Sequence, residues 1–157
     1  MATKTNAVRL VQQAGIPCRE AFYEFDEQDL SGVHAAQAIG MPEEQVFKTL
    51  VARGEKTGIN VFCIPVCCEL DLKKAAKAAG DKNMELVAVK ELLGLTGYIR
   101  GGCSPVGMKK SYPTFIDETC TLWDEIAVSA GARGHQMIVP PQPLADLVGA
   151  ELTDIIV

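Results

Sequence analysis

The sequence predicts a single α/β domain over residues 1–157, in which helices surround a mixed, largely antiparallel β-sheet or partial barrel. A chain of 157 residues is long enough for one hydrophobic core, and no linker, repeat or low-complexity segment divides it. Hydrophobic residues make up 48% of the chain and charged residues 22%, which is the balance of a globular protein. The predicted helices are interleaved with hairpins rather than with single strands, which favours a mixed sheet over a parallel one.

The first third of the chain predicts two helices and one strand. In residues 3–15 apolar residues recur at helical spacing before a glycine that ends the pattern. Residues 18–25 alternate between apolar and polar side chains as a strand does. Residues 31–41 predict a helix with Ser31 as its N-cap and Gly40 at its end.

The middle of the chain holds the clearest hairpin pattern. Residues 44–53 and 59–66 are rich in β-branched side chains, and the glycine-containing turn GEKTG separates them. Residues 71–80 then predict a third helix, capped by Asp71 and ended by Gly80.

The remaining elements are short. A strand is predicted over 84–89 and a helical turn over 89–95, and residues 97–102 are expected to lead as a strand into a glycine-rich loop. The last third predicts three strands, a helix that prolines begin and a final strand, over 113–117, 126–131, 136–140, 141–149 and 151–156 in that order.

Bulk properties exclude several classes of function. A net charge of −5 argues against non-specific binding to nucleic acid, but not against binding one end of it. No apolar segment is long enough to span a membrane and the start lacks the apolar core of a signal peptide, so we expect a soluble, cytoplasmic protein. In that compartment the six cysteines predict thiols packed as small apolar residues, and their spacing fits no metal site. We therefore expect no metal and no cofactor.

The segment GGCSPVGMKK, which begins at Gly101, admits three functions. A nucleotide P-loop is excluded because lysine must follow its second glycine, where this chain has Met108. Nucleophilic catalysis by Cys103 requires a base, which one of the two histidines supplies only if the fold brings it close. The backbone amides of Gly101 and Gly102 are the third option, because such amides bind a carbonyl oxygen or an oxyanion. The pattern of three glycines around Ser-Pro favours this backbone binding loop.

Lys48 interrupts a predicted strand whose other members are almost all apolar. From the pattern alone, two interpretations stay open. Lys48 is either an edge or snorkelling lysine, or it points into a pocket to hold a carboxylate, a phosphate or an ester carbonyl.

Four segments together resemble the YbaK/EbsC family of aminoacyl-tRNA deacylases: FKTLV, LDLKKAAKAAG, GYIRGGCSPVGMKK and VSAGARG, in this order. These proteins are freestanding relatives of the editing domain of bacterial prolyl-tRNA synthetases. The resemblance extends from about Tyr23 to the C-terminus. It implies an editing-domain fold and the removal of mischarged cysteine from the 3′ acceptor end of tRNA(Pro), with prolyl-tRNA synthetase as the expected partner.

The resemblance also implies the residues of the site. The family's invariant lysine falls on Lys48 and its glycine loop on Gly101 and Gly102, which we take as the catalytic residues. The expected substrate-binding residues are Tyr23, Thr49, Cys103, Ser104, Pro105, Ser129 and Gln136. Family members often carry an acidic residue where this chain has Gln136, so we expect no general base at that position and an altered pocket specificity.

The implied mechanism needs no nucleophile from the protein. The thiol of the substrate cysteine attacks its own carbonyl and leaves as a cyclic thiolactone, while Lys48 and the glycine loop position the substrate and stabilise charge. Cys103 is then replaceable, and Lys109 and Lys110 are expected to flank the mouth of the site. Two alternatives remain: a deacylase for another misacylated tRNA, such as Ala-tRNA(Pro), or an inactive module that binds tRNA or a synthetase.

Overall fold

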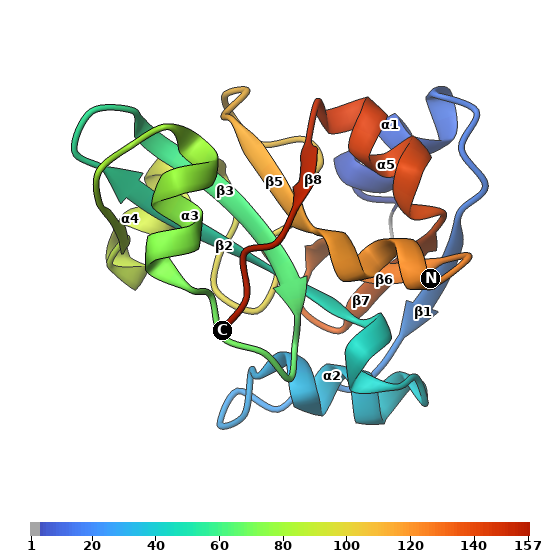
Figure 1. Ribbon diagram of the computed structural model, residues 1–157. Helices are drawn as coiled ribbons and strands as arrows, with labels where there is room; N and C mark the ends of the chain where they lie inside the picture. The colour runs from blue at the N-terminus through green and yellow to red at the C-terminus, as the bar shows by residue number, and fades with distance from the viewer. Residues whose placement is uncertain (1–3) are drawn as a thin grey trace.

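Five α-helices and two β-sheets make up residues 4–157, the part of the chain that the computed structural model describes (Figure 1). The helices are α1 (Asn6–Gln13), α2 (Gly32–Ile39), α3 (Leu72–Ala79), α4 (Val89–Thr96) and α5 (Pro141–Val148), with 3₁₀ turns at Glu43–Gln45 and Glu118–Leu122. The strands are β1 (Arg19–Phe22), β2 (Phe47–Gly54), β3 (Gly58–Pro65), β4 (Met84–Leu86), β5 (Thr114–Asp117), β6 (Ile126–Ala132), β7 (His135–Val139) and β8 (Glu151–Thr153). The first predicted helix was expected to begin at residue 3, which lies outside the described residues.

The ends of α2 and α3 follow from their local sequence. The Ser31 hydroxyl accepts a hydrogen bond from the His34 amide at 3.2 Å, and Asp71 caps α3 in the same way. Gly40 and Gly80 end these helices in the left-handed conformation, with φ of +72° and +74°. The predicted caps and ends of both helices are confirmed.

The strands form two sheets where the sequence predicted one. The larger sheet has the order β4-β2-β3-β5-β8 and the smaller has the order β1-β7-β6. All pairs are antiparallel except β3 with β5 and β5 with β8, so the predicted mixed, largely antiparallel pairing is confirmed. A parallel bridge between Val46 and Ala127 joins the start of β2 to β6, and the two sheets do not close into a barrel.

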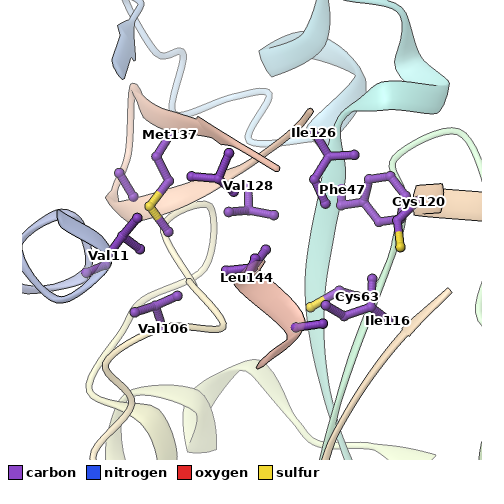
Figure 2. Packing of buried hydrophobic residues seen from close by; sticks show 14 of the residues in the cluster. Val11, Phe47, Cys63, Val106, Ile116, Cys120, Ile126, Val128, Met137 and Leu144 are labelled. Atoms are coloured by element: carbon purple, nitrogen blue, oxygen red, sulfur yellow. The ribbon is translucent and has the colours of Figure 1, made fainter. Parts of the chain in front are cut away.

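The main hydrophobic core lies between the two sheets and the helices α1 and α5. Figure 2 shows Val11 of α1, Phe47 of β2, Val128 of β6, Met137 of β7 and Leu144 of α5 packed together. A second cluster lies under α3, which packs on the other side of the β2–β3 hairpin. Both faces of β2 are therefore packed, which fixes the position of this strand.

The predicted strand over 97–102 is wrong. Gly97 ends α4 with a φ of +86°, and the chain then makes a turn in which the Gly102 amide donates to the Ile99 carbonyl at 3.0 Å. Gly101 has a φ of +86°, the value that a type II turn requires at its third residue. Two glycines with positive φ in five residues prevent an extended strand.

All six cysteines are thiols, as predicted, but not all are packed. Cys63 is buried in β3, whereas Cys67 and Cys68 lie in the turn after that strand, Cys67 exposed and Cys68 half-buried. Their sulfur atoms are 3.9 Å apart. Pro65 ends the strand pairing, and the Cys68 amide turns back to the Pro65 carbonyl at 3.0 Å.

None of the helices in residues 4–157 has the length and the apolar composition needed to cross a bilayer.

Candidate active site

A pocket of about 380 Å³ lies beside β2, where the two sheets meet. It is of the size that holds a small molecule. Strand β6 bridges β2 at Val46, and strand β4 pairs with β2 only from Ala52 onward. The five residues between these contacts, 47–51, all line the pocket. Strand β3 pairs with the other edge of β2 throughout, so the site occupies the stretch of the free edge that neither β6 nor β4 covers.

Several elements complete the wall. The residues that line the pocket outside β2 are Tyr23, Leu30, Ser31, Gly32, Val33, Ala35, Val46, Val66, Leu86, Val87, Ala88, Val89, Leu92, Arg100, Gly101, Cys103, Ser129 and Gln136. The N-terminal ends of α2 and α4 both face the space. The sequence did not predict this wall. The structure shows why residue 32 is glycine: a Cβ there would lie 2.2 Å from Val66 Cγ1, so only glycine lets α2 approach so closely.

Lys48 is half-buried in the pocket wall. The bridge between Val46 and Ala127 runs parallel, so Lys48 lies level with Ser129 of β6. In the described part of the chain no carboxylate forms an ion pair with the Lys48 ammonium. Its positive charge is available to a ligand.

Of the two predicted glycines, Gly101 lines the pocket and Gly102 does not. The Gly102 amide is engaged by the Ile99 carbonyl, and a Cβ on Gly102 would lie 3.1 Å from the backbone of Ala132. The Gly101 amide has no hydrogen-bond partner among residues 4–157. In this conformation Gly101 is therefore the amide left for a ligand, while Gly102 permits close packing of the loop on β6.

Ser104 and Pro105, which were expected to touch the substrate, lie away from the pocket and are buried. The Ser104 hydroxyl accepts a hydrogen bond from the Val106 amide at 3.2 Å. Tyr98 in turn donates its hydroxyl to the Val106 carbonyl. Ser104 and Pro105 therefore shape the loop, and the structure does not place them among the residues that line the pocket.

Cys103 lines the pocket but is poorly suited to be a nucleophile. Its side chain is buried, and burial raises the pKa of the thiol to about 11, so it stays protonated at neutral pH. Neither histidine lines the pocket. His34 packs against Tyr23 with ring centroids 6.3 Å apart, and His135 pairs with Glu20 on the opposite face of β7. Cys103 thus lacks the base that the nucleophile hypothesis required.

Ser129 and Gln136 form a cross-strand pair at the floor of the pocket. The Ser129 hydroxyl accepts a hydrogen bond from the Gly131 amide at 3.1 Å. Gln136 is 6% exposed, and its Oε1 has no hydrogen-bond partner among residues 4–157. Buried amide oxygens in folded proteins are almost always paired, so this one is available to a ligand.

Tyr23 and Thr49 also line the pocket as predicted. The Tyr23 amide donates to the Gly134 carbonyl at 2.9 Å, which ties the end of β1 to the β6–β7 turn. The Lys109 ammonium, by contrast, reaches the Gly94 carbonyl near the C-terminal end of α4, whereas the N-terminal end of this helix lines the pocket. Neither Lys109 nor Lys110 lines the pocket, and the expectation that they flank its mouth stays a prediction.

The charged groups of the site are cationic. The ionisable side chains that line the pocket are Tyr23, Lys48, Arg100 and Cys103, and no carboxylate or imidazole is among them. In residues 4–157 no cluster of three histidine, cysteine or acidic side chains is placed to hold a metal ion. The pocket can hold an anion or polarise an ester carbonyl, but it offers no general base.

The comparison with protein families identifies the class. Residues 30–147 match the family described as the aminoacyl-tRNA editing domain. The chain belongs to this family, and the predicted YbaK-type fold and the prediction of an aminoacyl-tRNA deacylase are confirmed.

Three known proteins are similar to this chain over nearly its whole length. The chain is 45% identical over 152 residues to EbsC of Enterococcus faecalis (strain ATCC 700802 / V583), which is named as a candidate Cys-tRNA(Pro)/Cys-tRNA(Cys) deacylase; the match covers 97% of this chain and 93% of EbsC. A solved structure of a candidate trans-editing enzyme for prolyl-tRNA synthetase is 28% identical, with a TM-score of 0.80 over 99% of both chains. The structure of protein APE2540 has a TM-score of 0.85 over 95% of this chain and 97% of its own; at 21% identity it shows the fold alone.

Proposed function

We propose that this protein removes mischarged cysteine from Cys-tRNA(Pro) in trans. The observation that carries the proposal is the pocket itself, which is lined by two cationic side chains but by no carboxylate and no imidazole. A deacylase without a general base needs a substrate that brings its own nucleophile, and cysteine does so. The names of EbsC and of the trans-editing enzyme support this choice among amino acids.

The reaction then proceeds by cyclisation of the substrate. The cysteine thiol loses its proton to solvent, and the thiolate sulfur attacks the ester carbonyl carbon. The bond between this carbon and the ribose oxygen breaks, the ribose oxygen takes a proton from solvent, and a cyclic thiolactone leaves. Lys48 and the Gly101 amide hold the developing oxyanion and fix the ester for attack.

Deacylation of matched substrates tests this function. The wild type should release cysteine from Cys-tRNA(Pro) but neither serine from Ser-tRNA(Pro) nor alanine from Ala-tRNA(Pro), because neither carries a thiol. Lys48→Met, which keeps the length of the side chain but not its charge, should lower the rate by about 100- to 1,000-fold. Rapid release of alanine would replace the thiol mechanism with one that uses water. Binding of tRNA without any release would favour an inactive tRNA-binding module.

We further propose that prolyl-tRNA synthetase delivers the substrate. The net charge of −5 gives the protein little general attraction for tRNA, and a pocket of about 380 Å³ encloses no more than the aminoacyl end. Alone, the protein should therefore cleave Cys-tRNA(Pro) and Cys-tRNA(Cys) at similar rates. Adding the synthetase should accelerate cleavage of Cys-tRNA(Pro) selectively. Equal rates with and without the synthetase at high salt would contradict its role.

A further inference from the structure

We infer that Gln136 keeps the pocket positively charged and thereby promotes ionisation of the substrate thiol. This inference rests on the proposed function, since it concerns how that site activates cysteine. Gln136 does not take part in the reaction itself. It contributes by being uncharged, because a carboxylate at this position would cancel the electric field of Lys48.

The strand registers place Gln136 opposite Lys48. The parallel bridge between Val46 and Ala127 sets Lys48 level with Ser129, and Ser129 pairs with Gln136 across β6 and β7. Residues that lie level on neighbouring strands share a face, and all three of these residues line the pocket. Paired strands are about 4.8 Å apart and β2 separates from β6 after Val46, which puts the Lys48 and Gln136 backbones about 10 Å apart or more. Their long side chains lie on either side of the space that a substrate would fill.

The fold itself does not use the Gln136 amide. The side chain is 6% exposed and lines the pocket, yet its Oε1 has no hydrogen-bond partner among residues 4–157. A buried polar group without a partner is unfavourable for the empty protein. The side chain is therefore an uncharged group that faces the ligand and is not required by the hydrogen bonds of the fold.

Acidic side chains near the site lie outside the pocket lining. Four of them are engaged elsewhere: Glu91 caps α4 at Ala88 and pairs with Arg53, Asp29 lies 4.0 Å from His34 Nδ1, Asp117 accepts from the Ile155 and Thr119 amides, and Glu20 pairs with His135. The ionisable groups on the lining are Tyr23, Lys48, Arg100 and Cys103, and the Cys68 thiol, outside the lining, is close enough to interact with the Lys48 charge. A thiol in the pocket therefore meets Lys48 and Arg100 without a balancing carboxylate.

The size of the effect follows from ordinary electrostatics. A cysteine thiol has a pKa of about 8.5, and an opposite charge within 4–6 Å lowers the pKa of such an acid by about 1–3 units. A carboxylate at position 136 would act in the opposite direction. Below the pKa, each unit changes the thiolate fraction about tenfold, and because a more acidic thiol gives a less nucleophilic thiolate, the cyclisation rate changes by about threefold.

The pH dependence of cysteine release tests this inference. Single-turnover cleavage of Cys-tRNA(Pro) is measured from pH 6 to 10 for the wild type, Gln136→Glu and Gln136→Met. The pH of half-maximal rate should rise by about one unit or more in Gln136→Glu, with the rates converging at high pH. Gln136→Met removes the amide without adding charge and should keep the wild-type midpoint. An unmoved midpoint in Gln136→Glu, or an equal rise in both variants, would overturn the inference.

A reporter thiol makes the test independent of the reaction. Ser129→Cys places a thiol on the pocket floor, and its pKa is read from the pH dependence of alkylation by iodoacetamide, followed at the level of the peptide. This pKa should be about one unit or more lower with Gln136 than in the Gln136→Glu background; equal values would refute the inference. If the wild type leaves Cys-tRNA(Pro) intact, the proposed function fails. The alkylation experiment still shows whether Gln136 affects the pKa of a thiol in the pocket. If Gln136→Glu does not fold, Leu86→Glu is compared with Leu86→Gln in the same two experiments. Leu86 lines the pocket and is 52% exposed.

Discussion

Replacement of Gly101 by alanine tests whether catalysis depends on the conformation of the glycine loop, and Gly40→Ala is its matched control. Both glycines have a left-handed backbone, with φ of +86° and +72°. An alanine in this conformation costs about 1–2 kcal/mol. For a domain of this length, such a loss lowers the melting temperature by about 2–8 °C. We expect both variants to melt at a lower temperature than the wild type, Gly101→Ala by at least as much as Gly40→Ala.

The two variants should differ in activity, because only Gly101 lines the pocket. A Cβ on Gly101 would lie 3.3 Å from Leu30 Cδ2 and 3.5 Å from Arg133 Cγ, whereas a Cβ on Gly40 would meet no atom within 4 Å. Leu30 is itself part of the pocket wall. The new methyl group therefore adds crowding at the site to the strain of the turn. A shift of about 1 Å in a positioning group costs about 100-fold in rate, and we expect a loss of that order in kcat/KM.

The assay is deacylation of Cys-tRNA(Pro) at 25 °C by the wild type and both variants, with thermal melting followed by circular dichroism. The temperature is chosen so that all three proteins stay folded. Gly40→Ala should keep the wild-type kcat/KM. If Gly101→Ala also keeps it, the loop does not position the ester, and the reasoning from its geometry is refuted. If both variants lose activity equally, the rate reports stability alone.

Three other substitutions probe the frame around the site. Gly32→Ala should lower the free energy of unfolding by about 1–3 kcal/mol, because its Cβ would overlap Val66, and Val66→Ala in the same chain should restore part of it in urea titrations. Partial burial would raise the pKa of the Asp81 carboxyl. Hydrogen bonds from the amides of Thr57, Lys82 and Lys56 outweigh this effect and hold the pKa well below its usual range. Since the folded pKa is the lower one, this stabilisation is present above about pH 4, the unfolded pKa, and is lost as the pH falls below it; acid unfolding of Asp81→Asn should therefore vary less with pH. Cys103→Ser should keep deacylation within about threefold of the wild type; complete loss in a folded variant would instead establish a catalytic thiol.

Local chemistry predicted the elements whose boundaries depend on nearby residues. Ser31 and Asp71 cap their helices and Gly40 and Gly80 end them, because capping is a matter of three or four residues. The same reasoning failed at Tyr98, Ile99 and their neighbours, where the apolar content of a strand was outweighed by the positive φ of Gly97 and Gly101. Division of the strands into two sheets was also missed, since strand pairing between distant segments leaves no trace in a single sequence.

The site was predicted less evenly than the fold. The alternation of apolar residues left Lys48 open between an edge and a pocket, and the resemblance to a family decided for the pocket. Ser104 and Pro105 were expected beside the substrate because they follow the glycines in the chain, but the turn at Gly101 directs them inward. The helix ends that complete the wall come from residues without a distinctive pattern. Contacts of this kind depend on tertiary packing, which propensity and spacing do not encode.

The position of β2 explains why this fold has a site at all. Its first residue, Phe47, is held in the core between the sheets, and Ala52 is held in the cluster under α3. Between these anchors the strand passes from one sheet to the other, after β6 has left it at Val46 and before β4 joins it. An uncovered strand edge in an exposed place invites aggregation, but here the ends of α2 and α4 enclose it. The result is a rigid strand with one unpaired edge, on which Lys48 is fixed in position without a partner charge. A substrate that brings its own nucleophile needs little more from the protein.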